Sequence, residues 1–182
     1  QMQEELVGLQ KQLGTTFVHV THDQDEAMSI ADTVVVMNQG RIEDRGTPDR
    51  VYLKPASLFT ATFMGESNLL EARVTKGGET DIIASTSLGA IALDGRAAIG
   101  DKVHLSVRPE QMRLAGGDDT TSLGRATIKA LVFQGANRRC HATPIHAPDM
   151  DLVLSVPLDI PVETGDEVEI FVRRNDVVML SS

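Results

Sequence analysis

His22 is the residue whose type and position best fit a chemical role. It follows an apolar run that ends at Val20, and it precedes Asp23 and Glu26, whose spacing of three is typical of a helix N-cap and its partner. Side chains at the carboxyl end of a buried strand project into the crevice where α/β proteins bind ligands. A histidine there can donate a hydrogen bond to a phosphate oxygen or orient a water. The alternative is a histidine on a solvated turn, and the spacing alone favours that interpretation.

Cys140, His141 and His146 lie near one another in the sequence. Their spacing fits no structural zinc pattern, because such sites need two paired sets of ligands. No metal ligand and no cofactor-binding residue is therefore predicted. His104 alternates with apolar neighbours, which predicts a surface histidine on the polar face of a strand.

Arginines provide two further candidates. Arg138 and Arg139 form a short basic pair, which is more typical of a solvated edge than of an anion site. Arg108 precedes Pro109 and Glu110, and the proline is expected to end a strand.

The first 65 residues alternate between helical and strand-like patterns. Apolar residues at helical spacing predict a helix that ends at Gly14, and these are Met2, Leu6, Leu9 and Leu13. Buried strands are expected at 15–20 and 33–37, with a helix over 23–31 between them. A turn at 38–40 predicts a hairpin returning through 41–44. Further helices are expected after Thr47, which can act as a cap before Pro48, and over 57–64.

This order of elements is typical of an α/β layer with a parallel sheet. Two strands are too few for such a sheet, which needs cover on both faces, so residues 1–65 are predicted to be the end of a larger α/β domain. The chain does not begin with methionine, and its first residues resemble no signal or transit peptide. We therefore expect it to be a piece of a longer protein.

After Gly65 apolar and polar residues alternate with a period of two, which is typical of strands with one buried face. The alternating apolar sets are Leu70/Ala72/Val74, Val103/Leu105/Val107, Ala126/Ile128/Ala130/Val132, Leu152/Leu154/Val156 and Val168/Ile170/Val172. Many short antiparallel strands predict a small barrel. Residues 100–108 and 165–173 share the pattern G-D-x-V-x-(L/I)-x-V-R, which indicates either a repeated turn or a duplicated half-barrel.

Composition excludes several classes of protein. The chain has 182 residues, 41% of them hydrophobic, and a net charge of −9, so it can bury a core but lacks the basic surface that nucleic acid requires. An aromatic content of 3% also argues against base stacking. The one cysteine excludes an internal disulfide and favours a reducing compartment. No apolar run approaches the roughly 20 residues of a membrane span.

Residues 17–28 and 31–42, which include His22, resemble the end of the ATP-binding subunit of ABC importers. The resemblance continues through residues 46–48 and 63–68. Residues 105–110, Leu-Ser-Val-Arg-Pro-Glu, are similar to a segment of the C-terminal TOBE domain of that family, an OB-like barrel. In detail the chain is most similar to the spermidine/putrescine branch of these importers. The resemblance implies an α+β chain, with the remnant of an α/β P-loop ATPase domain over 1–65 and an all-β OB-like (TOBE) barrel over 66–182.

In that family the histidine matching His22 is the switch residue that contacts the γ-phosphate of ATP and assists hydrolysis. The resemblance places the phosphate-binding loop, the magnesium-binding aspartate and the catalytic glutamate before Gln1. No stretch of the form G-x-x-x-x-G-K-(S/T) occurs in the chain. ATP and Mg²⁺ are thus expected in the parent protein, with none bound here and no ATPase activity by this chain.

The resemblance also implies partners and a location. The expected partners are membrane permease subunits and a second copy of the chain, with no nucleic acid, and the expected location is the cytoplasm, peripheral on the inner face of the cell membrane. The TOBE part would regulate the ATPase or support dimer contacts. A non-enzymatic β-barrel module that binds a small ligand or docks to a protein is the alternative. Without an upstream domain, residues 1–65 are expected to be rearranged or to expose apolar surface.

Overall fold

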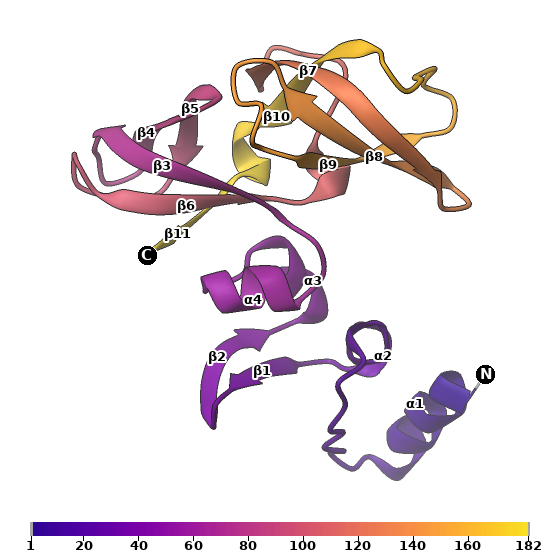
Figure 1. Cartoon of the computed structure of the whole chain (residues 1–182). Coiled ribbons are helices and arrows are strands. Elements are labelled where there is room, and N and C mark those ends of the chain that lie inside the picture. The colour runs from indigo at the N-terminus through magenta and orange to yellow at the C-terminus, as the bar shows by residue number, and fades with distance from the viewer. Residues whose placement is uncertain (1, 182) are drawn as a thin grey trace. The chain divides into compact units, whose positions relative to one another are not determined.

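The computed structural model describes residues 2–181, so Gln1 and Ser182, which the predicted domain ranges include, lie outside the described residues. The chain divides into two compact units, Gln1–Gly65 and Glu66–Ser182, called unit 1 and unit 2 below (Figure 1). Within the part of the chain that the structure describes, no helix has the length and apolar character needed to cross a membrane.

Unit 1 contains four helices and one hairpin among its described residues. Its elements are α1 (Met2–Leu13), α2 (Gln24–Ile30), β1 (Val34–Asn38), β2 (Arg41–Gly46), α3 (Pro48–Leu53) and α4 (Leu58–Phe63). The predicted end of the first helix at Gly14 is confirmed. This glycine has a φ of 62°, and its N–H donates to the carbonyl of Gln10 at 3.0 Å.

Side-chain caps set where the short helices begin. The carboxylate of Asp23 accepts from the backbone N–H of Glu26 at 3.0 Å, and the hydroxyl of Ser57 accepts from that of Thr60 at 3.1 Å. The predicted cap at Asp23 is therefore confirmed, and Ser57 adds a second cap that the sequence analysis did not name. Thr47 is the N-cap residue of α3 and Pro48 opens the helix, as predicted, but the side chain of Thr47 makes no capping hydrogen bond.

The β1–β2 hairpin forms as predicted, with Gln39 and Gly40 at φ values of 48° and 78°. Val34 and Val36 face the small core of unit 1, while Val35 and Met37 point away and are exposed. The predicted exposure of apolar surface is thus present on this hairpin. Its two strands are antiparallel, and they form a sheet of two strands only.

A buried carboxylate connects β2 to the helices that follow it. Asp44 accepts from the backbone N–H groups of Arg45 and Ala56, each at 2.7 Å, and it also pairs with the guanidinium of Arg50. Its side chain is only 2% exposed, so these donors replace the water that the charge loses on burial.

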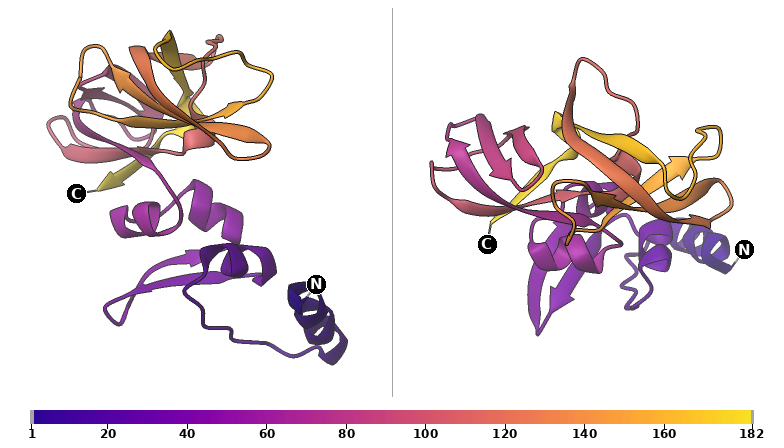
Figure 2. Two further views of the ribbon diagram at one scale, coloured as in Figure 1. Left: turned by 45° about the vertical axis from the view of Figure 1, so that its right-hand side comes forward. Right: turned by 45° about the horizontal axis from the view of Figure 1, so that its top comes forward.

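The predicted strand over 15–20 is wrong. Residues 15–20 form no strand and are exposed, with Val18 and Val20 at 88% and 90%, and Figures 1 and 2 draw them as a coil between α1 and α2. An isolated β-branched run cannot satisfy its backbone groups without a neighbouring strand. β1 pairs only with β2, so the predicted parallel sheet is absent from the described residues.

Unit 2 is all-β apart from two single turns of 3₁₀ helix. Its strands are β3 (Asn68–Lys76), β4 (Asp81–Thr86), β5 (Gly89–Asp94), β6 (Lys102–Val107), β7 (Thr120–Phe133), β8 (Asn137–Pro144), β9 (Leu152–Pro157), β10 (Glu167–Arg173) and β11 (Val178–Ser181). They form a sheet of order β11-β6-β3-β4-β5 and a sheet of order β10-β7-β8-β9, both antiparallel. The two sheets share one core, which confirms the all-β part of the predicted fold.

The period-two pattern identifies the buried faces correctly in most strands. Leu70, Leu105 and Leu154 are each at most 1% exposed. The prediction is wrong in the second half of β7, where Ala130 and Val132 are exposed although the pattern placed them in the core. A β-bulge between Ile128 and Ala130 shifts the register there, and a shift of one residue reverses which face is buried.

Unit 2 is built from two copies of one folding pattern. Gly100 and Gly165, which open the two G-D-x-V segments, have φ values of 95° and 98°. The N–H of Gly100 donates to the carbonyl of Val74 at 2.8 Å, and that of Gly165 donates to the carbonyl of Ile128 at 2.9 Å. The two glycines therefore make the same turn against the same position of β3 and β7.

The strands around these turns correspond as well. β3 pairs with β4 and β6 in the first copy, as β7 pairs with β8 and β10 in the second. Each copy ends in a 3₁₀ turn, η1 (Pro109–Gln111) in the first and η2 (Arg174–Asp176) in the second. The shared sequence pattern thus marks a duplicated half of unit 2 and not only a repeated turn.

The two copies exchange their last segments. After η1 the chain crosses to the second copy, where Arg113 and Phe171 exchange backbone hydrogen bonds of 2.9 and 2.8 Å. After η2 the chain returns to the first copy, where β11 pairs with β6. Each copy therefore completes the sheet of the other.

Candidate functional site

His22 lies on an exposed turn directly before α2. Because the strand predicted over 15–20 is absent, His22 is not at the carboxyl end of a sheet strand in this structure, and that part of the prediction is wrong. The ring belongs to no buried core. Among the described residues, the position of His22 agrees with the alternative interpretation, a histidine on a solvated turn.

Hydrogen bonds around His22 define the shape of this turn. The hydroxyl of Thr21 accepts from the backbone N–H of Asp23 at 3.0 Å, and Asp23 in turn caps α2 through Glu26. The Nε2 of His19 lies 3.1 Å from Oε2 of Glu26. Hydrogen bonds from the side chains of Thr21 and His19 lower the pKa of Glu26 below its usual value. These contacts hold the residues on both sides of His22.

This arrangement can present one imidazole to a ligand and little more. A neutral imidazole can accept or donate one hydrogen bond at each ring nitrogen. Among the described residues no group of three or more histidine, cysteine, aspartate or glutamate side chains is arranged to hold a metal ion.

The structure does not bring Cys140, His141 and His146 together into one site. Cys140 points into the core, and burial raises the pKa of its thiol to about 11. His141, the next residue of β8, points to the other face, where its Nδ1 lies 2.7 Å from Oδ2 of Asp151. His146 lies beyond the end of β8 and is exposed.

The arginines of interest have structural partners. Arg138 donates to the carbonyls of Leu158, Ile160 and Val162 at 3.2, 2.6 and 3.3 Å, and it therefore orders the loop after β9. Arg139 pairs with Glu66. The short basic pair is thus half-buried and engaged, and not a solvated edge as predicted.

Arg108 is also a structural residue. Its side chain is almost fully buried, and its Nη1 donates to the carbonyl of Glu66 at 2.9 Å. Pro109 ends β6 as predicted and begins η1. His104 is half-buried on the outer face of the same strand, where the alternation placed it.

Sequence reasoning missed Asn68, whose side chain joins the two sheets of unit 2. Its Nδ2 donates to the carbonyl of Val153 at 2.8 Å, and its Oδ1 accepts from the N–H of Val153 at 2.7 Å. The same Nδ2 lies 3.3 Å from the carbonyl of Val107. The amide of Asn68 thus pairs with β9 in the way that the backbone of a neighbouring strand would.

Comparison with known proteins identifies relatives of this chain. The model of the TOBE domain family matches residues 105–180. The spermidine/putrescine import ATP-binding protein PotA of Acetivibrio thermocellus is 40% identical over 137 residues, covering 75% of this chain and 38% of that protein. The protein of the same name from Nitratidesulfovibrio vulgaris is 45% identical over 142 residues, covering 75% and 39%. That of Thermobifida fusca is 37% identical over 165 residues, covering 84% and 40%.

These matches confirm the resemblance to spermidine/putrescine-type importer ATP-binding proteins. The chain spans about two fifths of the length of these relatives. Among solved structures, the cytoplasmic molybdate-binding protein ModG with molybdate bound has a TM-score of 0.53 and 11% sequence identity, and the match covers 63% of this chain and 96% of that one. At this identity the likeness concerns the fold alone.

Proposed function

We propose that this chain is the C-terminal part of the ATP-hydrolysing subunit of an ABC importer, and that the importer takes up spermidine or putrescine. One observation carries the proposal. The match to the Thermobifida fusca protein covers 84% of the chain, which is more than unit 2 contains, so the similarity reaches into unit 1 and is not confined to the TOBE match. In this proposal unit 1 is the end of a P-loop ATPase domain and unit 2 is its TOBE domain.

His22 is the catalytic residue that we propose in unit 1, as the switch histidine that contacts the γ-phosphate of ATP. Its exposed position on a turn fixed by Thr21 and Asp23 supports this role, because the ring is accessible to a ligand. The other requirements of phosphoryl transfer are a phosphate-binding loop, a lysine and Mg²⁺ ligands. The 182 residues contain no such loop, so they do not fit ATP and Mg²⁺ as a complete site.

It follows that the purified chain alone has no ATPase activity. The measurement is phosphate release from Mg²⁺-ATP at micromolar protein, with and without vanadate. Turnover that vanadate inhibits would contradict the assignment of this chain as a part of the ATPase that lacks the main catalytic groups. In the complete subunit, His22→Ala should abolish hydrolysis while ATP binding persists, and His146→Ala, which alters an exposed histidine beyond the end of β8, serves as the matched control.

The remaining features of the parent protein follow from the same proposal. Its partners are membrane permease subunits and a second copy of the subunit, and its place is the cytoplasmic face of the membrane. Unit 2 regulates the ATPase or contributes dimer contacts. Support comes from the names of the relatives, which describe ATP-binding proteins of spermidine/putrescine import, and from the core of unit 2, whose residues all belong to that unit.

Uptake measurements test the proposed substrate. In the source cell, deletion of the gene region that encodes this chain should abolish uptake of labelled spermidine or putrescine, while uptake of sugars and inorganic anions is unchanged. Loss of sugar or anion uptake with normal polyamine uptake would overturn the substrate assignment. Normal uptake of all solutes would favour the alternative, a free-standing binding module, for which the likeness of unit 2 to ModG is the supporting observation.

A further inference from the structure

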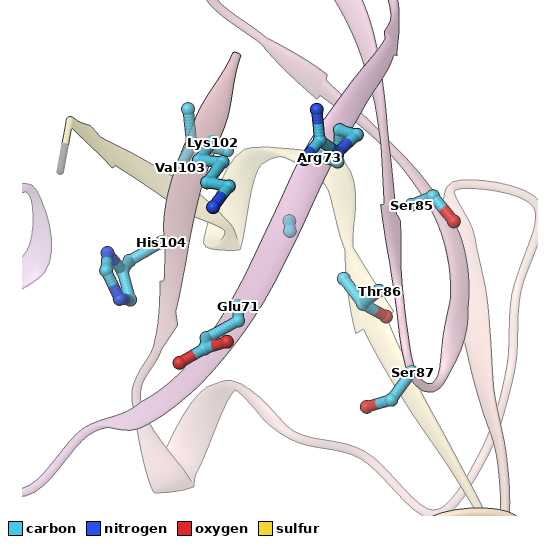
Figure 3. A pocket seen from close by; sticks show the side chains of 9 residues that line it. Glu71, Arg73, Ser85, Thr86, Ser87, Lys102, Val103 and His104 are labelled. Atoms are coloured by element: carbon cyan, nitrogen blue, oxygen red, sulfur yellow. The ribbon is translucent and has the colours of Figure 1, made fainter. Parts of the chain in front are cut away.

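A groove on the outer face of the five-stranded sheet of unit 2 is lined by charges of both signs. Figure 3 shows Glu71 and Arg73 projecting from β3, and Lys102 and His104 from β6. Arg73 donates to the carbonyl of Gly100 at 3.0 Å, and Lys102 also has a partner. The cations of this groove are therefore engaged, and no ligand is needed to compensate them.

The turn around His22 in unit 1 is closed by a ring of three hydrogen bonds. The backbone N–H of Asp23 donates to the hydroxyl of Thr21, and the backbone N–H of Glu26 donates to Oδ1 of Asp23, each at 3.0 Å. The hydroxyl of Thr21 donates in turn to the carboxylate of Glu26. Each of these three residues thus donates one hydrogen bond and accepts one, and the ring encloses the chain segment that contains His22.

The carboxylate of Glu26 extends an ordinary helix cap toward the N-terminus. In a capping box, the glutamate at the third helical position accepts directly from the backbone N–H of the N-cap residue. Asp23 is the N-cap of α2 and Glu26 is at that third position, but the hydroxyl of Thr21 stands between the two groups. The cap of α2 alone does not require this hydroxyl. The ring therefore fixes the backbone before His22 as well as the backbone after it.

A second contact of the same carboxylate involves His19. Oε2 of Glu26 lies 3.1 Å from Nε2 of His19. The hydrogen bonds from Thr21 and His19 favour the ionised carboxylate, and they lower the pKa of Glu26. The ring of His22 takes part in none of these hydrogen bonds and is exposed, so it stays available to a ligand while its neighbours are held.

We propose that Glu26 is a positioning residue for His22, whose carboxylate fixes the turn from which the imidazole reaches the γ-phosphate of ATP. This inference rests on the proposed function, in which His22 is the switch histidine. Glu26 acts through the turn and does not touch the nucleotide. A misplacement of about 1 Å in a group that takes part in the reaction can cost on the order of 100-fold in rate. Glu26 should therefore affect the rate of hydrolysis and not the binding of ATP.

The test is ATP hydrolysis by the complete subunit carrying Glu26→Ala. We expect kcat to fall about 10- to 100-fold, while the KM for ATP and the amount of ATP bound per subunit stay unchanged. Asp25→Ala is the matched control, because Asp25 is an exposed carboxylate in the same first turn of α2 and takes no part in the ring. It should leave kcat unchanged.

Two further measurements separate positioning from a loss of folding. Glu26→Gln keeps a side-chain oxygen that can accept from Thr21, so this variant should recover most of the lost hydrolysis. The 182-residue chain allows a second readout that needs no ATP. NMR order parameters of the backbone amides of His22 and Asp23 should fall in Glu26→Ala and stay unchanged in Asp25→Ala.

Three results would overturn the proposal. The first is an equal kcat in Glu26→Ala and Asp25→Ala. The second is a loss of bound ATP per subunit in proportion to the loss of kcat, which would indicate unfolded protein. The third is equally slow hydrolysis by Glu26→Gln and Glu26→Ala, which would show that the ring of hydrogen bonds is not the cause.

His22→Ala, measured beside these variants, separates this inference from the proposed function. Full hydrolysis by His22→Ala would overturn the switch role of His22 and, with it, the role of Glu26. If His22→Ala is inactive and Glu26→Ala is as active as Asp25→Ala, the proposed function stands and only the positioning role of Glu26 is lost.

Discussion

Replacing Asn68 by alanine should destabilise unit 2 more than any other single truncation of a polar side chain in β3. The amide of Asn68 makes hydrogen bonds to both backbone groups of Val153 and a longer one to the carbonyl of Val107. Asn68 and Val153 are 5% and 8% exposed, so water reaches the broken partners poorly. A buried group left without its hydrogen bond costs about 1–3 kcal/mol. Two such groups on Val153 give an expected loss of about 2–6 kcal/mol in the free energy of unfolding.

Calorimetry and urea unfolding followed by circular dichroism measure this loss. For a chain of this size, 1 kcal/mol corresponds to a shift in Tm of about 2–4 °C, so Asn68→Ala should lower the Tm of unit 2 by roughly 4–24 °C. Asn175→Ala is the matched control, because Asn175 is exposed in η2 and its loss should cost less than about 0.5 kcal/mol. Asn68→Asp keeps the acceptor but turns the donor into an oxygen that faces two carbonyls, and it should be at least as destabilising at pH 7.

Hydrogen exchange locates the effect. In Asn68→Ala the amide of Val153 should exchange faster, while amides of β7 and β10, which lie away from this contact, should change only by the global loss of stability. Equal stability of Asn68→Ala and Asn175→Ala would refute the reasoning, because it would show that water or a rearranged β9 satisfies the groups of Val153 without cost.

Three other changes test local features. Burial raises the pKa of Cys140 to about 11, so at pH 8 the neutral thiol should resist a disulfide reagent in the folded chain and react fully in urea. Thr21→Val removes the hydrogen bond that is the largest cause of the lowered pKa of Glu26, so the pKa of Glu26 should rise in an NMR titration. Because folding lowers this pKa, ionised Glu26 stabilises the folded state at pH values above its pKa in the unfolded chain. That stabilisation is lost as the pH falls through the pKa of Glu26 in the folded chain. Arg174→Ala removes the cation that pairs with both Asp94 and Asp81, two carboxylates that lie opposite each other in the sheet. Thermal unfolding should show a loss of stability below about 1 kcal/mol. High salt or the added change Asp94→Asn should largely restore the stability, because each reduces the repulsion between the two carboxylates.

Local sequence signals predicted the local structure of unit 1 well. Gly14, Asp23 and Ser57 mark helix ends whose hydrogen bonds form within a few residues, and no distant contact is needed to form them. The strand predicted over residues 15–20 is wrong because its formation depends on a distant contact. Their β-branched composition favours a strand, but a strand forms only when another segment accepts its hydrogen bonds, and composition does not say whether that segment is present.

The sequence also predicted the alternating strands of unit 2. Its predictions failed where the strand register or a long-range contact determines which side chains are buried or paired. The bulge after Ile128 leaves no mark in the alternation, so Val132 was placed in the core although it is half exposed. Asn68 lies 85 positions from Val153 in the sequence, and neither residue type indicates that the two residues form hydrogen bonds with each other. The role of His22 remains assigned by resemblance alone.

The exchange of end segments in unit 2 affects how the nascent chain can fold during synthesis. β11, which includes Val178, completes the sheet built around β3 and β6, so that sheet stays incomplete until β11 has left the ribosome. Neither copy can become a finished intermediate while the other is being translated. Truncation of the chain before β11 should therefore disturb the beginning of unit 2 as much as its end.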